Sequence, residues 1–332
     1  MVNLLLAFLL TFLVAVLFAP LVIKLAKKVG AKQEILEYVT AHKNKQGTAT
    51  MGGLIFVLPA IIIALVFCNG QASVAYVALG VFFGYCLLGF LDDFIKVHTH
   101  KNLGLRAYQK VIGQVGIAVI AGLFMYYSGI MGSVIYLPWG GEVDLSWGII
   151  PFVIFVFLAM TNASNLTDGL DGLAGWTSFI MLIGIVAIIG ITDVKLLANG
   201  GGGDISQQLQ NLMLVGVTTA GGLLAFLCFN SFPAKIFMGD TGSLALGGVI
   251  TSLAVFSGWT LLLPIICVVF VVSAVSVVIQ VLHYKRTKRR VFLMAPLHHH
   301  FEKKGVNETK IVAIYIVVTI IACVLGVLCS LL

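Results

Sequence analysis

Acidic residues stand in three clusters along the chain, each at the end of a long apolar segment. Asp92 and Asp93 occur in LGFLDDFIK, Asp168 and Asp171 in NASNLTDGLDGLAG, and Asp240 in FNSFPAKIFMGDTGSLALGG. A carboxylate at the edge of hydrocarbon is costly unless it has a partner or a function. Any one of these residues alone could be a helix cap or a solvated helix end. Three such clusters on one side of a membrane favour a shared site.

These side chains favour magnesium-assisted phosphate chemistry. Adjacent carboxylates such as Asp92 and Asp93 repel one another unless they share a cation or a proton, and hard oxygen ligands near phosphate favour Mg2+. Asp168 and Asp171, three residues apart, are predicted to lie on one helical face. The glycines of that segment permit close backbone approach, and its asparagines can bind a base or a sugar through their amides. A diphosphate bridged by Mg2+ suits such a site.

Basic residues beside these clusters supply the complementary charge. Lys96 follows Asp93 by three residues, so the two are predicted to share a face if the helix continues. Lys45 and Thr50 lie in HKNKQGTATMGG, just before an apolar segment, and Lys110 lies beyond LDDFIK. We interpret the other lysines of this side mainly as anchors that orient the protein in the membrane, namely Lys43, Lys101 and the basic run 285–290.

Three consecutive histidines, His298, His299 and His300, form the last cluster, in MAPLHHHFEKKG. Zn2+ binding is disfavoured because neighbours in sequence cannot readily converge on one ion, and no further His or Cys cluster in the sequence completes a closed site. Proton transfer or phosphate contact near neutral pH is the favoured role. Local packing is the alternative for any one of the three.

The composition requires a membrane protein. Of the 332 residues, 60% are hydrophobic and only 10% are charged, and the mean hydropathy is +1.09. A soluble domain needs far more polar surface. No polar stretch is long enough to fold by itself, so we expect a single polytopic membrane domain over residues 1–332. The six cysteines lie in or beside apolar runs without ligand spacing, and we interpret them as packing residues.

Ten apolar segments are candidate membrane helices, although several are shorter than the roughly 20 residues that a bilayer requires. The weakest, residues 149–160, is retained because its removal would put the acidic clusters on opposite sides. The predicted spans are Leu4 to Ile23, Leu54 to Cys68, Val74 to Leu91, Val111 to Tyr127, Ile149 to Met160, Trp176 to Ile191, Leu212 to Phe229, Leu244 to Trp259, Leu261 to Leu282 and Ile311 to Leu331.

The distribution of basic residues predicts how these spans are oriented across the membrane. The loops after the odd-numbered spans carry every Lys and Arg of the chain except Lys195, and they carry all seven histidines. The positive-inside rule therefore makes these loops cytoplasmic and leaves both termini on the outer side. On the outer side, alternating residues within 132–147 predict a small exposed β-hairpin. Trp139 and Trp147 suit an interfacial aromatic belt.

Five segments, taken in order, resemble the motifs of the polyprenyl-phosphate N-acetylhexosamine-1-phosphate transferase superfamily: HKNKQGTATMGG, LDDFIK, NASNLTDGLDGLAG, FMGDTGSLALGG and PLHHHFEKKG. They spread from residue 42 to residue 305. The aspartate motifs mark the superfamily, and PLHHHFE is similar to its phospho-N-acetylmuramoyl-pentapeptide transferase branch. Two positions depart from the family pattern, because Ala49 stands where Pro is usual and Val306 where Trp is usual. Both differences would affect the shape of the loops beside the motifs.

The resemblance implies a bacterial inner-membrane enzyme of peptidoglycan synthesis. It would transfer phospho-MurNAc-pentapeptide from UDP-MurNAc-pentapeptide to undecaprenyl phosphate, giving lipid I and UMP. Mg2+ is the implied cofactor, with Asp92, Asp93 and Asp240 as its ligands. The implied partners are the donor, the acceptor lipid and the bilayer, with a homodimer as an option and no nucleic acid.

The resemblance also implies roles for individual residues. Asp92, Asp93 and Asp240 would be catalytic, with Asp92 the base toward the lipid phosphate, and Lys96 and His298 would join them. The other matching positions would bind substrate: Asn165, Asp168 and Asp171 on the nucleotide side, Phe237 near the uracil, and Lys45, Thr50, Lys110, Asn230, Gln280, His299 and His300 elsewhere in the pocket.

Three alternatives stay open at this point. A related transferase would use UDP-GlcNAc as its donor. A secondary transporter of an anionic solute would place charges near the bilayer midplane, often in two repeated halves, whereas these acidic residues gather at one face and no repeat is evident. Finally, an aspartyl-phosphate intermediate competes with direct attack by the lipid phosphate, which we prefer because one step needs no second protected intermediate.

Overall fold

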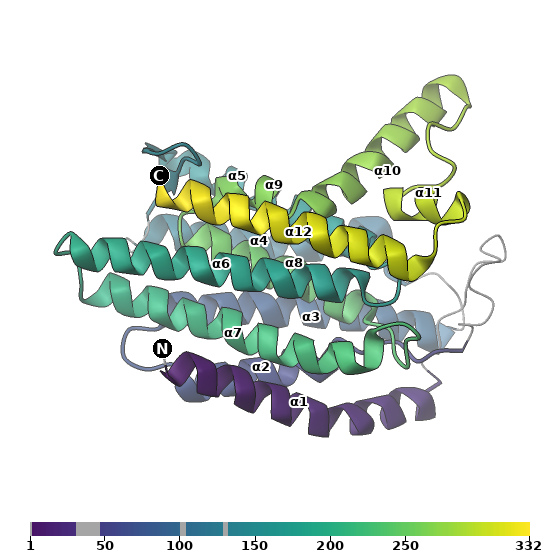
Figure 1. Cartoon of the computed structure of the whole chain (residues 1–332), viewed down its shortest axis with the longest axis horizontal. Helices are drawn as coiled ribbons and strands as arrows, with labels where there is room; N and C mark the ends of the chain where they lie inside the picture. The colour runs from purple at the N-terminus through teal and green to yellow at the C-terminus, as the bar shows by residue number, and fades with distance from the viewer. Residues whose placement is uncertain (1, 31–46, 100–103, 129–131) are drawn as a thin grey trace.

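The computed structural model describes residues 2–30, 47–99, 104–128 and 132–332, and it forms a bundle of long helices with one small sheet (Figure 1). Short 3-10 turns, η2 (Ser146–Gly148) and η3 (Thr260–Leu262), join some of the elements. The α-helices are α1 (Val2–Lys28), α2 (Leu54–Phe67), α3 (Ser73–Thr99), α4 (Ala107–Tyr127), α5 (Ile149–Thr167), α6 (Leu173–Ala198), α7 (Asp204–Asn230), α8 (Gly239–Phe256), α9 (Leu263–Ile266), α10 (Val268–Thr287), α11 (Leu297–Lys303) and α12 (Glu308–Leu331).

Nine of the described helices are long and apolar enough to cross a membrane. They correspond to nine of the ten predicted spans, including the weakest, which is α5. The remaining predicted span is α2, which is helical but has only 14 residues. Its rise of about 21 Å is short of the roughly 30 Å hydrocarbon core. The prediction of a mostly helical, multi-pass membrane protein is therefore confirmed, with one helix shorter than a full span.

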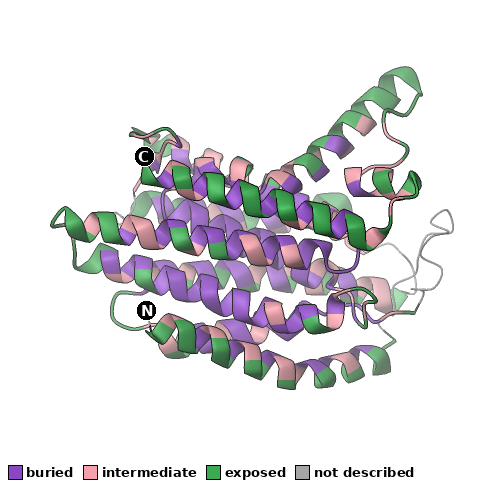
Figure 2. Cartoon of the chain, viewed as in Figure 1, coloured by how far each residue is buried: buried purple, intermediate pink, exposed green. Residues whose placement is uncertain are grey.

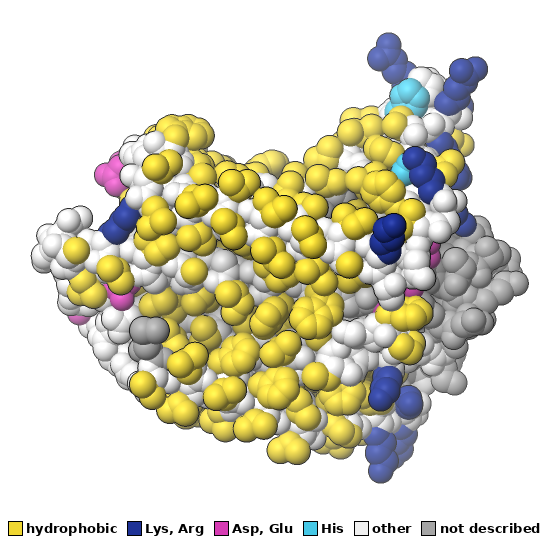
Figure 3. All heavy atoms as spheres, viewed as in Figure 1, with side chains coloured by type: hydrophobic (Ala, Val, Ile, Leu, Met, Phe, Trp, Pro, Cys, Tyr) yellow, Lys and Arg dark blue, Asp and Glu magenta, His cyan; other side chains and the backbone are white. Residues whose placement is uncertain are grey.

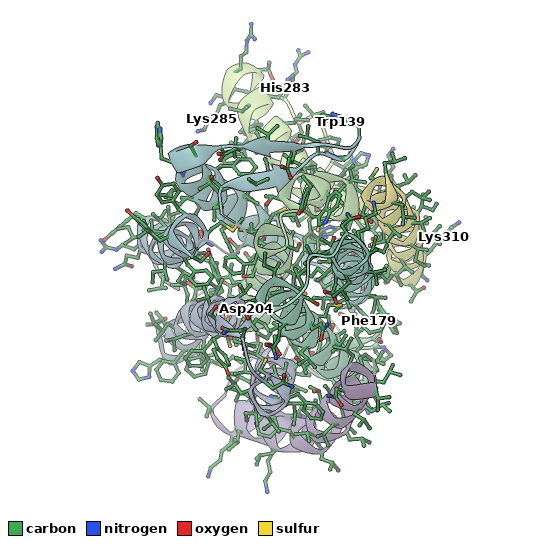
Figure 4. The ribbon with its side chains drawn as sticks, turned by 90° about the vertical axis from the view of Figure 1, so that its left-hand side faces the viewer. Trp139, Phe179, Asp204, His283, Lys285 and Lys310 are labelled. Atoms are coloured by element: carbon green, nitrogen blue, oxygen red, sulfur yellow. The ribbon has the colours of Figure 1, made fainter. Side chains whose placement is uncertain are left out.

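The predicted ninth span is not a single helix. The structure replaces it with η3, α9 and α10, and Cys267, at φ −97° and ψ 30°, interrupts the helix between α9 and α10. The prediction was wrong because the apolar run is continuous in sequence while the backbone turns within it. Figure 1 shows α10 leaning out of the bundle after this break, and Figure 4 shows His283 and Lys285 at its projecting end.

The two termini lie at the same end of the bundle in Figure 1, as the predicted even number of spans requires. The predicted hairpin is present at that end as β1 (Val134–Tyr136) and β2 (Glu142–Asp144), an antiparallel pair in which Val134 faces Asp144. The Tyr136 N–H donates to the Gly258 carbonyl at 2.9 Å and fixes the hairpin on the bundle. Trp139 and Trp147 remain largely exposed, as an interfacial belt requires.

The centre of the bundle is formed by α7 and α8. In their membrane-spanning segments 83% and 89% of the residues are buried, against 22% in α10. Figure 2 shows buried residues in the middle of the bundle and exposed residues along α1, α10 and α12. The exposed surface is largely hydrophobic between the two ends (Figure 3), as contact with lipid requires. The helix that carries Asp240 is thus the most enclosed element of the fold.

Glycines let α3 and α8 approach each other closely. A Cβ atom on Gly89 of α3 would lie 2.0 Å from the backbone oxygen of Asp240, and one on Gly248 of α8 would lie 2.5 Å from the ring of Tyr85. Small residues at such contacts allow the backbones of membrane helices to pack together. The start of α8 is therefore pressed against the last turns of α3.

We predict that Gly89→Ala destabilises the protein by about 1–3 kcal/mol, because the added methyl group must push α8 away from α3. Gly80→Ala is the matched control, since Gly80 lies on the same helix and has no atom within 4 Å of an added Cβ. Thermal unfolding of the two purified variants in the same detergent measures the difference. Equal unfolding midpoints would contradict the proposed close packing.

Candidate active site

Three carboxylates from two distant segments meet where α3 ends and α8 begins. Asp92 and Asp93 lie near the end of α3 and are buried, and Asp240 lies in the first turn of α8 and is half-buried. Oxygen atoms of all three lie within 4.8 Å of one another. The predicted meeting of these two clusters is confirmed, and the resulting group of oxygens is one that a divalent cation could bridge.

Asp93 holds the start of α8. Its Oδ1 accepts a hydrogen bond from the backbone N–H of Asp240 at 3.2 Å, and its Oδ2 accepts from the N–H and the hydroxyl of Thr241 at 2.9 and 2.7 Å. The first N–H groups of a helix lack partners within the helix and carry partial positive charge. Asp93 therefore acts as a helix cap, one of the roles that the sequence allowed. It caps α8, however, and not α3, the helix to which it belongs.

Asp240 contacts side chains from three other helices. Lys110 Nζ lies 2.7 Å and Lys96 Nζ 3.1 Å from its Oδ2, and the Asn165 amide donates to its Oδ1 at 2.7 Å. These partners come from α4, α3 and α5, so four helices meet at one carboxylate. The same Asn165 amide donates to the Ser243 hydroxyl at 2.9 Å. Ser243 was missed in the sequence, although its position three residues after Asp240 puts it on the same face of α8.

Lys96 joins all three carboxylates. Its Nζ lies 2.5 Å from Asp92 Oδ2 and 3.9 Å from Asp93 Oδ1, in addition to its contact with Asp240. The predicted shared helical face is confirmed because α3 continues to Thr99. The other oxygen of Asp92 accepts the backbone N–H of Leu105 at 2.7 Å, which fixes the segment just before α4.

Asp168 and Asp171 lie in a turn between α5 and α6, so the prediction that they share a helical face was wrong. The helix α5 ends at Thr167, and Gly172, with φ +75°, adopts a left-handed conformation just before α6. Asp171 is buried, and its Oδ2 accepts the backbone N–H of Ala234 at 3.0 Å.

The charges of the carboxylate cluster nevertheless affect Asp168 in this turn. Burial, followed by the negative charges of Asp240, Asp93 and Asp171, raises the pKa of Asp168 to about 8. Asp168 therefore lies close enough to the carboxylate cluster for the charges of Asp93 and Asp240 to affect it.

The segment between α7 and α8 connects this turn to the rest of the site. Asn230 accepts the N–H of Gly172 at 3.1 Å and donates to the Ile236 carbonyl at 2.9 Å. Phe237 pairs through its backbone N–H with the Ala49 carbonyl at 2.8 Å. Thr50 is buried, and its hydroxyl faces Gly239 at the start of α8. Lys45 lies outside the described residues.

Two histidines of α11, His298 and His299, lie against the same turn at Gly169. His298 is fully buried, and a Cβ atom on Gly169 would lie 2.3 Å from its Nε2. Burial and the neighbouring His299 lower the pKa of His298 to about 3, so its ring is neutral at pH 7. His299 Nδ1 lies 2.9 Å from Glu302 Oε2, and His300 Nδ1 accepts the Leu293 N–H at 3.1 Å.

Gln280 of α10, predicted to bind substrate, uses its amide to hold nearby backbone. Its Oε1 accepts the N–H groups of Val291 and Phe292, each at 3.0 Å, and its Nε2 donates to the Phe292 carbonyl at 3.0 Å. These bonds fix the segment that leads from α10 to α11. The residue thus supports the position of the histidines from outside the carboxylate cluster.

We predict that Asp93→Ala lowers both stability and turnover, because α8 loses three hydrogen bonds at its first turn. Leaving those donors unpaired costs about 1–3 kcal/mol. Asp93→Asn keeps one acceptor oxygen and should recover part of the unfolding temperature. If Asp93 acted only as a chemical base, Ala and Asn would be equally inactive and both would melt like the parent. Thermal unfolding and turnover, measured on the same samples, separate these outcomes.

We also predict a pH-dependent contribution from His298. Its folded pKa of about 3 lies below the roughly 6.5 of an unfolded histidine. Its neutral ring therefore supports the fold fully above about pH 6.5 and progressively less as the pH falls toward 3, a loss of about 2 kcal/mol at pH 5. The unfolding midpoint of His298→Leu should fall less between pH 7 and pH 5 than that of the parent. His283→Leu, at an exposed position of α10, is the control, and identical pH slopes for all three proteins would refute the prediction.

Comparisons with known proteins give this arrangement a family. Residues 74–258 match the model of the family described as Glycosyl transferase family 4. The chain is 42% identical to a phospho-N-acetylmuramoyl-pentapeptide-transferase of Clostridium kluyveri, over 98% of this chain and 99% of that protein. Proteins of the same name from Clostridium perfringens and Desulfitobacterium hafniense are each 40% identical, over 97% and 86% of this chain and 96% and 85% of theirs. The chain therefore belongs to glycosyl transferase family 4 and is an enzyme that transfers a phospho-sugar.

Proposed function

We propose that the enzyme transfers phospho-MurNAc-pentapeptide from UDP-MurNAc-pentapeptide to undecaprenyl phosphate, with release of UMP and formation of lipid I. The names of relatives that align over nearly the whole chain support the transferred group. The observation that carries the proposal is the meeting of Asp92, Asp93 and Asp240 with two lysines at the surface end of membrane helices. Such a site can receive a diphosphate from water and a phosphate from a lipid.

We propose Mg2+ as the ion of this site, held by Asp92, Asp93 and Asp240. The donors fit it, because they are hard oxygen atoms within 4.8 Å of one another. Three carboxylates against Lys96 and Lys110 also leave one negative charge unbalanced. Asp93 is bound to the backbone of α8, whereas Asp92 Oδ2 and Asp240 Oδ2 face lysine ammonium groups that an ion could displace. When bound, the ion supplies positive charge that stabilises a phosphate leaving group.

The lysines and Asp92 are proposed to act on the acceptor side. Lys96 and Lys110 offset phosphate charge, so that an anionic lipid phosphate can approach an anionic donor. Asp92 accepts the proton of the lipid phosphate. An oxygen of that phosphate then forms a bond to the sugar-linked phosphorus as the bond from this phosphorus to UMP breaks. Trapping an aspartyl-phosphate with donor alone would favour the two-step alternative.

The donor side is proposed to lie along the α5–α6 turn and the segment before α8. Asn165, Asp168 and Asp171 would hold the nucleotide there, with Phe237 near the uracil and Asn230 fixing the turn. Direct backbone and side-chain bonds already connect these segments. His298 rests against the same turn at Gly169, so it would position the donor as a neutral ring.

We propose that this site faces the cytoplasm and that both termini lie outside. Lys and Arg side chains gather mainly at the end of the bundle away from the termini (Figure 3), which the positive-inside rule makes the inner end. Family membership favours an enzyme over the transporter alternative. A homodimer stays a prediction. A donor assay distinguishes UDP-MurNAc-pentapeptide from UDP-GlcNAc.

We predict that Asp240→Ala lowers UMP release from UDP-MurNAc-pentapeptide by about 100- to 1,000-fold, because the variant loses a group that holds both the ion and the lysines. Asp204→Ala is the matched control, since Asp204 also lies in the first turn of a helix, and that helix, α7, begins at the end of the bundle where the termini lie (Figure 1). Radiolabelled donor, lipid acceptor and Mg2+ are supplied to both purified variants. Near-normal turnover by Asp240→Ala would remove this residue from the site, and turnover of UDP-GlcNAc alone would replace the donor.

A further inference from the structure

A cavity lies between the end of α1 and the segment that follows α7, and it is not lined by the residues of the carboxylate cluster. Its volume is about 480 Å3. Among the described residues that line it, the only charged side chains are three lysines. The lining residues are Pro20, Ile23, Lys24, Lys27, Phe229 and Lys235. We propose that this cavity binds an anionic phospholipid of the bilayer, with the phosphate headgroup at the lysines and part of an acyl chain against the apolar wall.

One face of α1 supplies most of this cavity in an order that suits a lipid. Pro20, Ile23, Lys24 and Lys27 follow the spacing of a single helical face. The apolar pair comes first and the lysines follow about one turn later, nearer the end of the helix. A helix of 27 residues rises about 40 Å, more than the roughly 30 Å hydrocarbon core. The lysines therefore reach the headgroup level while the apolar residues stay within the hydrocarbon.

The third lysine comes from a different part of the chain and is held in place. The backbone N–H of Lys235 donates to the Phe229 carbonyl at 2.8 Å, which fixes this residue beside the apolar wall that Phe229 provides. The position is independent of α1, so the lysines approach the cavity from two elements. Two elements that converge on one apolar cavity distinguish this site from lysines that only anchor a helix end.

The ammonium groups of these three lysines are available to bind an anion. Within the part of the chain that the structure describes, no ion pair or side-chain hydrogen bond engages the ammonium groups of Lys24, Lys27 or Lys235. Each basic residue near a membrane surface strengthens the binding of anionic lipid by about fivefold. Three unpaired lysines around one apolar cavity therefore complement a phosphate headgroup better than a zwitterionic one.

Lipid in this cavity would contact the same segment that Asp171 of the α5–α6 turn holds. Lys235 follows Ala234, whose backbone N–H is bound by Asp171 at 3.0 Å. The segment 231–238 thus has the lipid cavity on one side and the α5–α6 turn on the other. An occupied cavity would steady this segment, and this consequence holds whichever nucleotide sugar the enzyme uses.

The test compares two triple variants of the full chain that lose the same charge. Lys24→Gln, Lys27→Gln and Lys235→Gln remove the charges of the cavity. Lys285→Gln, Arg286→Gln and Lys288→Gln remove three exposed charges at the projecting end of α10. Phosphatidylglycerol is titrated into each protein in detergent with excess phosphatidylcholine. Native mass spectrometry then measures lipid binding, and hydrogen exchange measures protection of residues 231–238.

We expect roughly 100-fold weaker binding of phosphatidylglycerol by the cavity variant than by the parent, because three lysines are lost. We also expect parental binding by the α10 variant, and lipid-dependent protection of 231–238 in the parent and the α10 variant only. Equal binding by both variants would overturn the proposal, because the attraction would then be general. Equal protection of 231–238 by inorganic phosphate alone would also overturn it, because the acyl chain would have no part.

Discussion

The site depends on the hydrogen bonds between Asp93 of α3 and the first turn of α8. Those bonds satisfy the N–H groups of Asp240 and Thr241 at a buried helix start, where unpaired backbone groups are costly. Gly89 makes the contact possible, because a side chain there would collide with the Asp240 backbone. With α8 fixed in this way, Asp240 faces Lys96, Lys110 and Asn165 without further adjustment.

The remaining motifs attach to this junction through backbone contacts. The carboxylate of Asp171 binds the α7–α8 segment, Asn230 binds the α5–α6 turn, and the strand-like pairing of Ala49 with Ile236 brings Thr50 to Gly239. Many polar groups at this end of the bundle are thereby satisfied by one another. A bound ion and phosphates would find carboxylates and lysines already oriented, which lowers the cost of ordering them.

The sequence allowed correct predictions for features that depend on residues close together in the chain. Continuous apolar runs predicted the spans, and the shared helical face of Asp93 and Lys96 followed from helix geometry. Prediction failed where the backbone leaves regular structure. The helix α5 ends at Thr167 and Gly172 adopts a left-handed conformation, so the Asp168–Asp171 segment is not helical. Cys267 interrupts an apolar run that has no polar break. The cap on α8 joins residues 147 positions apart, so no local pattern could reveal it.

The central claim is that Asp92, Asp93 and Asp240 form one cation site. Crystals of the protein grown with Mn2+ in place of Mg2+, measured at the manganese absorption edge, test this claim most directly. We expect one anomalous peak in contact with oxygens of Asp92, Asp93 and Asp240, with Lys96 moved aside. An anomalous peak elsewhere, or none between these carboxylates at saturating Mn2+, would contradict it.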